Sequence, residues 1–111
     1  MMQAASIPGC SKATVVQNFP HHHINIISDP QNPDGELMEI RFKDIIVTYE
    51  VNDQGICHTG YLFSDGISDF ENYLNVCEKY FNPVTLNSWK YENCCIELMK
   101  EGPDFYFLFH I

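Results

Sequence analysis

The clearest pattern in the chain is an alternation of apolar and polar residues over most of residues 36–51. An alternation with a period of two is typical of β-strands that bury one face. The phase of the alternation shifts across Lys43 and Asp44, which predicts a tight turn or a bulge between two strands. The next four residues, 52–55, have the composition of a hairpin turn, and we expect the return strand over residues 56–63.

Shorter β patterns flank this hairpin on both sides. On the N-terminal side they cover residues 13–19 and 22–28, and on the C-terminal side residues 85–91, 94–99 and 105–111. The last of these segments is apolar on both faces, so we expect it to lie centrally in a sheet or to be covered. At an open edge, such a strand would promote aggregation.

One segment has the pattern of an amphipathic helix. Ser68 and Glu71 are spaced as in a capping box, in which each side chain bonds the backbone of the other residue. Apolar residues then recur at spacings of three and four, and Asn82-Pro83 should end the helix. These signals predict a single amphipathic helix over about residues 68–82.

The order of these elements predicts an α+β fold: a mainly antiparallel sheet of about five to six strands with that one helix packed on one face. A chain of 111 residues has room for one core. We expect residues 1–12 to form a flexible leader and residues 13–111 to form a single α+β domain.

The net charge of the chain indicates which kinds of partner it can bind. Fifteen acidic and six basic residues give a net charge of -9. This charge repels nucleic acid and anionic membranes and attracts basic protein surfaces, although it could also serve only to keep the chain soluble. No stretch approaches the roughly 20 apolar residues of a membrane span. The N-terminus does not resemble a secretory signal, and five irregularly spaced cysteines suit a reducing cytoplasm.

Three groups of residues carry side chains capable of metal binding or catalysis. His21 and His23 could bind a metal if further ligands joined them, but a solvated polar run is the simpler interpretation. Cys57 and His58 are adjacent, so their side chains diverge on a strand. Cys94 or Cys95 could meet His58 or His110 across strands, yet buried, inert cysteine is commoner. Asp65 and Asp69 could act as paired carboxylates, and more often such residues cap and solubilise a helix. We therefore expect no enzyme activity, no cofactor and no metal.

The remaining functional candidate is an acidic surface around the predicted helix. If its members lie on one side, they would suit a cationic partner; ordinary solvation and helix capping are the alternative. The expected partner-binding residues are Asp65, Asp69, Glu71, Asn75, Glu78 and Asp53.

A hairpin, a Ser-Asp-Phe-Glu helix and closing aromatic strands together resemble the small immunity proteins of bacterial contact-dependent and polymorphic toxin systems. The resemblance covers residues 36–111 and rests on this architecture and on residues 68–81. It implies a non-catalytic cytoplasmic protein that binds a basic toxin, often through acidic residues, with no residue positions to carry over. Two alternatives remain: a phage anti-defence protein that mimics DNA, and a small ligand-binding module that oligomerises through its aromatic strand.

Overall fold

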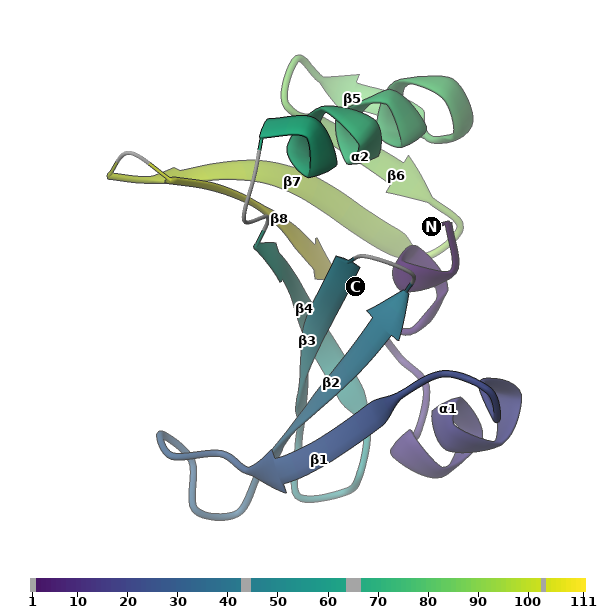
Figure 1. Cartoon of the computed structure of the whole chain (residues 1–111), viewed down its shortest axis with the longest axis vertical. Helices are drawn as coiled ribbons and strands as arrows, with labels where there is room; N and C mark the ends of the chain where they lie inside the picture. The colour runs from purple at the N-terminus through teal and green to yellow at the C-terminus, as the bar shows by residue number, and fades with distance from the viewer. Residues whose placement is uncertain (1, 43–44, 64–66, 103) are drawn as a thin grey trace.

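The computed structural model describes residues 2–42, 45–63, 67–102 and 104–111. The described chain is α+β, with one antiparallel sheet of eight strands and two α-helices (Figure 1). The helical segments are the 3-10 helix η1 (Met2–Ser6), α1 (Lys12–Asn18) and α2 (Ile67–Tyr80). The strands are β1 (Ile24–Ser28), β2 (Glu36–Phe42), β3 (Ile45–Val51), β4 (Cys57–Phe63), β5 (Asn82–Thr85), β6 (Ser88–Tyr91), β7 (Cys94–Glu101) and β8 (Asp104–His110).

The sheet has the strand order β1-β2-β3-β4-β8-β7-β6-β5. The last strand, β8, therefore joins two consecutive meanders, and its expected central position is confirmed. The sheet is larger than the five to six strands that we expected. The segment 85–91 was expected to be one strand, whereas the chain turns within it, between the short strands β5 and β6. No glycine or proline marks that turn, so the sequence lacks the usual signal.

The register divides the sheet into two faces. One face contributes the core, and each of its rows crosses several strands: Val47, Leu62 and Phe107 are successive partners, and all are buried. Tyr49, Gly60 and Phe109 form the adjacent row. Gly60 is required here because a Cβ at this position would lie 2.6 Å from a ring carbon of Tyr49. The absence of a side chain at Gly60 lets the Tyr49 ring approach β4 closely inside the core.

The N-terminal residues are packed, in contrast to the flexible leader that we expected for residues 1–12. Ala4, Ala5 and Ile7 are buried, and the Tyr49 hydroxyl donates a hydrogen bond to the Ala4 carbonyl at 2.8 Å. Further along, Gly9 N–H donates to the Cys57 carbonyl, which ties the segment to β4. Small apolar residues of a short helix can pack into a core just as strand residues do. The alternation of apolar and polar residues does not predict such helical packing.

The β-strand expected over residues 13–19 is also wrong, because Lys12–Asn18 form α1. Ser11 caps this helix by accepting a hydrogen bond from Thr14 N–H at 3.2 Å. Val15 is buried, and one turn later the Phe19 ring meets the Phe42 ring edge-on at 5.9 Å. Capping and contacts with the core thus outweigh the strand preference of the β-branched residues.

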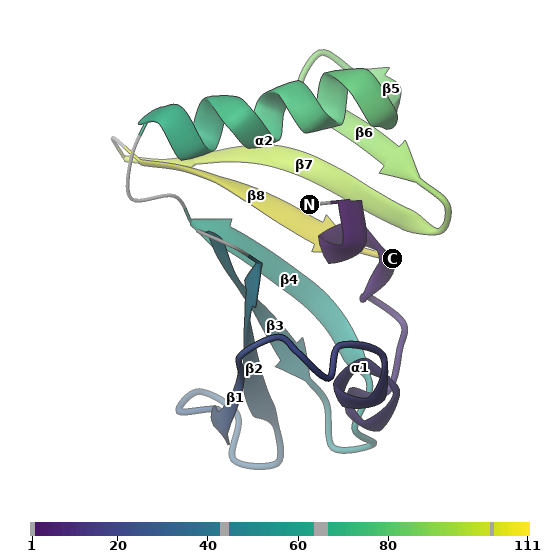
Figure 2. The ribbon, with the colours of Figure 1, turned by 45° about the vertical axis from the view of Figure 1, so that its right-hand side comes forward.

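The prediction of one helix packed on one face is wrong, since α1 and η1 also pack against the core, together with α2. Within α2, Tyr73 contacts Phe107 and Phe109 on β8, with ring centroids 5.0 and 5.7 Å apart, and also Phe81 at 6.4 Å. Figure 2 shows α2 lying along β7 and β8 while α1 lies beside the other half of the sheet. The expected capping box at Ser68 involves side chains outside the described residues; the helix itself begins at Ile67.

Candidate protein-binding surface

The face of the sheet opposite the core is a candidate surface, and we call it the open face. It comprises the residues that alternate with the buried ones, and none of its described members is buried. Its central members are Leu37, Glu39, Arg41, Ile46, Thr48, Glu50, Thr59, Tyr61, Phe63, Lys90, Cys95, Glu97, Met99, Tyr106, Leu108 and His110.

Carboxylates outnumber cations on the open face. Its described basic side chains are Arg41 and Lys90, and the acidic ones are Glu39, Glu50, Glu97, Glu101 and Asp104. Two carboxylates approach imidazoles: His110 Nε2 lies 2.9 Å from Glu97 Oε2, and His58 Nε2 lies 3.6 Å from Glu50 Oε2. All four side chains remain partly exposed, so an approaching molecule can reach them.

Three aromatic rings lie together on the open face, and we call them the aromatic cluster. Tyr61 and Phe63 come from β4 and Tyr106 from β8. The Phe63 and Tyr106 centroids are 4.9 Å apart, and Tyr61 lies 6.3 Å from each of them. Phe63 is 55% exposed, which is unusual for so large an apolar side chain. We did not predict this cluster, although Tyr61 and Phe63 stand at alternate positions of one strand.

A carboxylate is bonded directly to the aromatic cluster. The Tyr61 hydroxyl donates a hydrogen bond to Glu50 Oε1 at 2.8 Å. Burial raises the pKa of Tyr61 to about 12, together with this hydrogen bond and the negative charges of Glu50 and Asp29. The phenol is therefore neutral at physiological pH, and the carboxylates around it are negatively charged.

The acidic residues predicted from the sequence are only partly brought together. Glu71, Asn75 and Glu78 are exposed on α2 at positions i, i+4 and i+7, so they share one stripe of the helix. Asp53 lies in the β3–β4 turn, at the opposite end of the molecule from α2 in Figure 1. Asp65 and the Asp69 side chain fall outside the described residues. The predicted site is thus reduced to the helix stripe.

The histidine run is not arranged as a metal site. The His22 ring packs against the Phe19 and Phe42 rings, with centroids 5.1 and 5.5 Å away, while His21 and His23 are exposed. Among the residues that the structure describes, no group of three or more histidines, cysteines and acidic residues is arranged to hold a metal ion.

The cysteines divide into buried and accessible ones. Burial raises the pKa of Cys57 to about 11 and that of Cys94 to about 12, so both thiols are protonated at neutral pH and are poor nucleophiles. Cys95 is partly exposed and lies opposite His110 in the β7–β8 register. In that position His110 already bonds Glu97 through Nε2, and its Nδ1 lies 3.2 Å from the Ile111 carbonyl oxygen.

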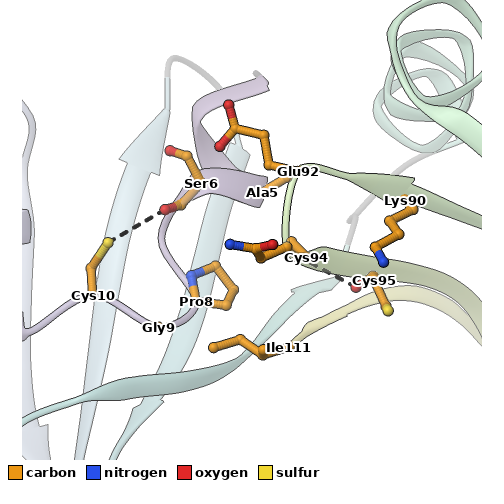
Figure 3. Close-up of a pocket in the computed structure, with 11 residues that line it drawn as sticks. Ala5, Ser6, Pro8, Gly9, Cys10, Lys90, Glu92, Cys94, Cys95 and Ile111 are labelled. Carbon is orange, nitrogen blue, oxygen red and sulfur yellow. Dashed lines mark hydrogen bonds between the residues drawn. The ribbon is translucent and has the colours of Figure 1, made fainter.

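An open cleft of about 670 Å³ lies between the segment after η1 and the β6–β7 hairpin (Figure 3). Among the described residues lining it, Lys90 and Glu92 are the charged side chains, and Cys10, Cys94 and Cys95 supply thiols. Glu92 has a positive φ of 54°, a backbone conformation favoured by glycine, because it occupies the tight β6–β7 turn. The lining combines small and apolar groups with one cation and one carboxylate.

No helix in the described part of the chain has the length and apolar character needed to cross a membrane. Comparison of the chain with protein-family models, with curated proteins and with solved structures gives no match. The surface chemistry of the molecule is therefore the basis for inferring its function.

Proposed function

We propose that this chain is a non-catalytic cytoplasmic protein that binds and neutralises a basic protein partner, as toxin-immunity proteins do. The observation that carries the proposal is the open face, on which carboxylates outnumber cations, the Phe63 ring is exposed and the Tyr61 and Tyr106 rings are partly exposed. Exposed aromatic side chains next to charged groups are typical of the anchors of protein interfaces.

Size and charge support this proposal. The molecule measures 35 × 29 × 25 Å, so its open face can offer the roughly 800 Å² that each partner buries in a standard interface. The net charge of -9 accelerates encounter with a basic surface and disfavours nucleic acid. The protonated state of Cys57 and Cys94 at neutral pH supports a non-catalytic role.

The proposal is tested by co-expressing this chain with the product of the neighbouring gene and measuring protection and complex formation. Two double variants that change the net charge equally show which of the two candidate surfaces binds the partner. Glu39→Lys with Glu97→Lys alters the open face, and Glu71→Lys with Glu78→Lys alters the α2 stripe. We expect the first double variant to lose binding and the second to keep it.

Loss of binding only in the α2 variant would keep the binding role and move it to the surface predicted from the sequence. Absence of any complex or protection with the wild-type chain would overturn the proposed function. Both variants retain their core residues, so circular dichroism spectra and thermal midpoints close to those of the wild-type chain are expected.

The aromatic cluster also favours a second candidate function, an assembly module whose copies cover each other's open face. In that case Phe63 and Tyr106 would be buried between two copies of the chain. Light scattering over a hundredfold range of protein concentration separates the two candidates. A mass that rises with concentration in the wild-type chain, but not in Phe63→Ala, would support self-association.

A further inference from the structure

We infer that the aromatic cluster together with Glu50 forms a binding site for arginine side chains of the partner protein. The inference deepens the proposed function by naming the chemical group that the open face recognises. It rests on the combination of exposed rings with a carboxylate hydrogen-bonded to one of them.

The site is built from three adjacent strands. β4 supplies Tyr61 and Phe63, β8 supplies Tyr106 and β3 supplies Glu50, and the strand order places β4 between the other two. Within one row of the sheet, Tyr61 pairs with Leu108 and Leu108 pairs with Glu97. A second carboxylate is therefore two strands away from Tyr61, roughly 10 Å along the row.

The geometry suits a guanidinium group better than an ammonium group. A guanidinium is planar, so it stacks on an aromatic ring while its N–H groups bond a carboxylate. The Tyr61 and Phe63 rings are nearly parallel, with an interplanar angle of 19°, and Phe63 is largely exposed. Glu50 bonds Tyr61 through Oε1 and lies 3.6 Å from His58 through Oε2, and its side chain is 35% exposed, which leaves it accessible to a donor.

The cations of this chain that contact aromatic rings do so elsewhere. Lys79 lies over the Tyr80 ring and Lys100 over the Phe105 ring, while Lys12 forms an ion pair with Glu36. Phe105 lies on the core side of β8, in alternation with Tyr106. In the described part of the chain, neither of these two lysine contacts involves a ring of the aromatic cluster. A cation from another molecule can therefore stack on these rings.

The inference is tested with two synthetic peptides of equal charge, hexa-arginine and hexa-lysine, both with blocked ends. Calorimetric titration at low salt compares their affinities for the full chain. We expect hexa-arginine to bind about threefold to fivefold more tightly, which matches the strength of an exposed cation–π contact. Amide chemical-shift changes should concentrate on β3, β4 and β8.

Variants identify the groups responsible. Phe63→Ala and Glu50→Gln should each reduce the preference for arginine to below twofold, since one removes a stacking ring and the other a charge. The matched control is Glu71→Gln with Glu78→Gln, which removes two charges from α2 and should leave the preference unchanged. Phe63 is more than half exposed, so its removal leaves the core intact.

Equal affinities for the two peptides, or shift changes confined to α2, would overturn the inference. This result is distinguishable from failure of the proposed function. If the protein prefers hexa-arginine as expected but no toxin-like partner is found, the arginine site is supported without the immunity role. If a basic partner binds through the open face without any arginine preference, the function stands and the inference falls.

Discussion

The hydroxyl of Tyr49 donates a hydrogen bond to the carbonyl of Ala4, a residue 45 positions earlier in the chain. Both residues are buried, and the bond joins the centre of the sheet to the N-terminal 3-10 helix. A buried carbonyl that loses its donor carries a desolvation cost, so this bond stabilises the packing of the N-terminal segment.

Tyr49→Phe should therefore destabilise the protein. Removing the hydroxyl leaves the Ala4 carbonyl without this donor, which costs about 1–3 kcal/mol. Urea unfolding followed by circular dichroism measures the loss as a lower midpoint with an unchanged slope. Faster amide exchange over residues 2–7 would show that the N-terminal segment is the part that loosens. An unchanged midpoint would show that the bond contributes nothing.

Tyr73→Phe is the matched substitution with the opposite expectation. The Tyr73 hydroxyl is buried and has no hydrogen-bond partner among the described residues. Deleting an unsatisfied buried hydroxyl removes a desolvation cost, so stability should stay equal or rise by about 1 kcal/mol. The same urea experiment measures it, and destabilisation as large as that of Tyr49→Phe would reveal a partner for this hydroxyl.

Gly60→Ala should destabilise the core through overpacking. The new methyl group would lie 2.6 and 2.7 Å from two ring carbons of Tyr49, a buried side chain with no room to retreat. Overpacking of this kind typically costs about 1–3 kcal/mol. Thr59→Ala is the control, because the adjacent Thr59 side chain points to the open face. A thermal midpoint equal to that of the control would contradict the tight contact.

The five cysteines should separate into two classes when a thiol reagent such as Ellman's is added to the folded protein. Cys10 and Cys95 are partly exposed and should react, while Cys57, Cys77 and Cys94 are buried and should react only after unfolding. Release of two equivalents of thiolate from the native chain and five in denaturant is the expected result. Cys10→Ser with Cys95→Ser should abolish the native reaction.

Stability should fall in alkaline solution. Burial raises the pKa of Cys57 from an ordinary value of 9.0 to about 11, and those of Cys77 and Cys94 to about 12. Because the unfolded chain loses these protons first, the stabilisation is complete below pH 9 and is lost as the pH rises toward 11–12. At pH 10 each thiol should cost on the order of 1 kcal/mol. Urea midpoints at pH 7.5 and pH 10, measured with reductant, provide the check.

The sequence predicted much of the sheet because alternation records which residues face a core. It identified the strands of the central hairpin, the aromatic strand β8 and the helix α2. It failed for α1, where the β-branched Val15 suggested a strand but a Ser11 cap and core contacts produced a helix. Such tertiary contacts are not visible in local propensity.

The candidate surface could be predicted only in part. Spacing on a helix is local, so the shared stripe of Glu71, Asn75 and Glu78 follows from the sequence. The aromatic cluster depends on strand order instead: Phe63 meets Tyr106 only because β4 pairs with β8, more than 40 residues later. Periodicity states which face a residue occupies but does not state which strand lies beside it.

The position of β8 between β4 and β7 has a consequence for how the protein is made on the ribosome. The two meanders, β1 to β4 and β5 to β7, are synthesised first, but neither has its neighbour until residues 104–110 emerge. Until then β4 and β7 each present an unpaired edge, which chaperones or neighbouring chains can occupy. Closure of the sheet therefore waits for the last strand that the structure describes, and it should be the slow, aggregation-sensitive step of biosynthesis.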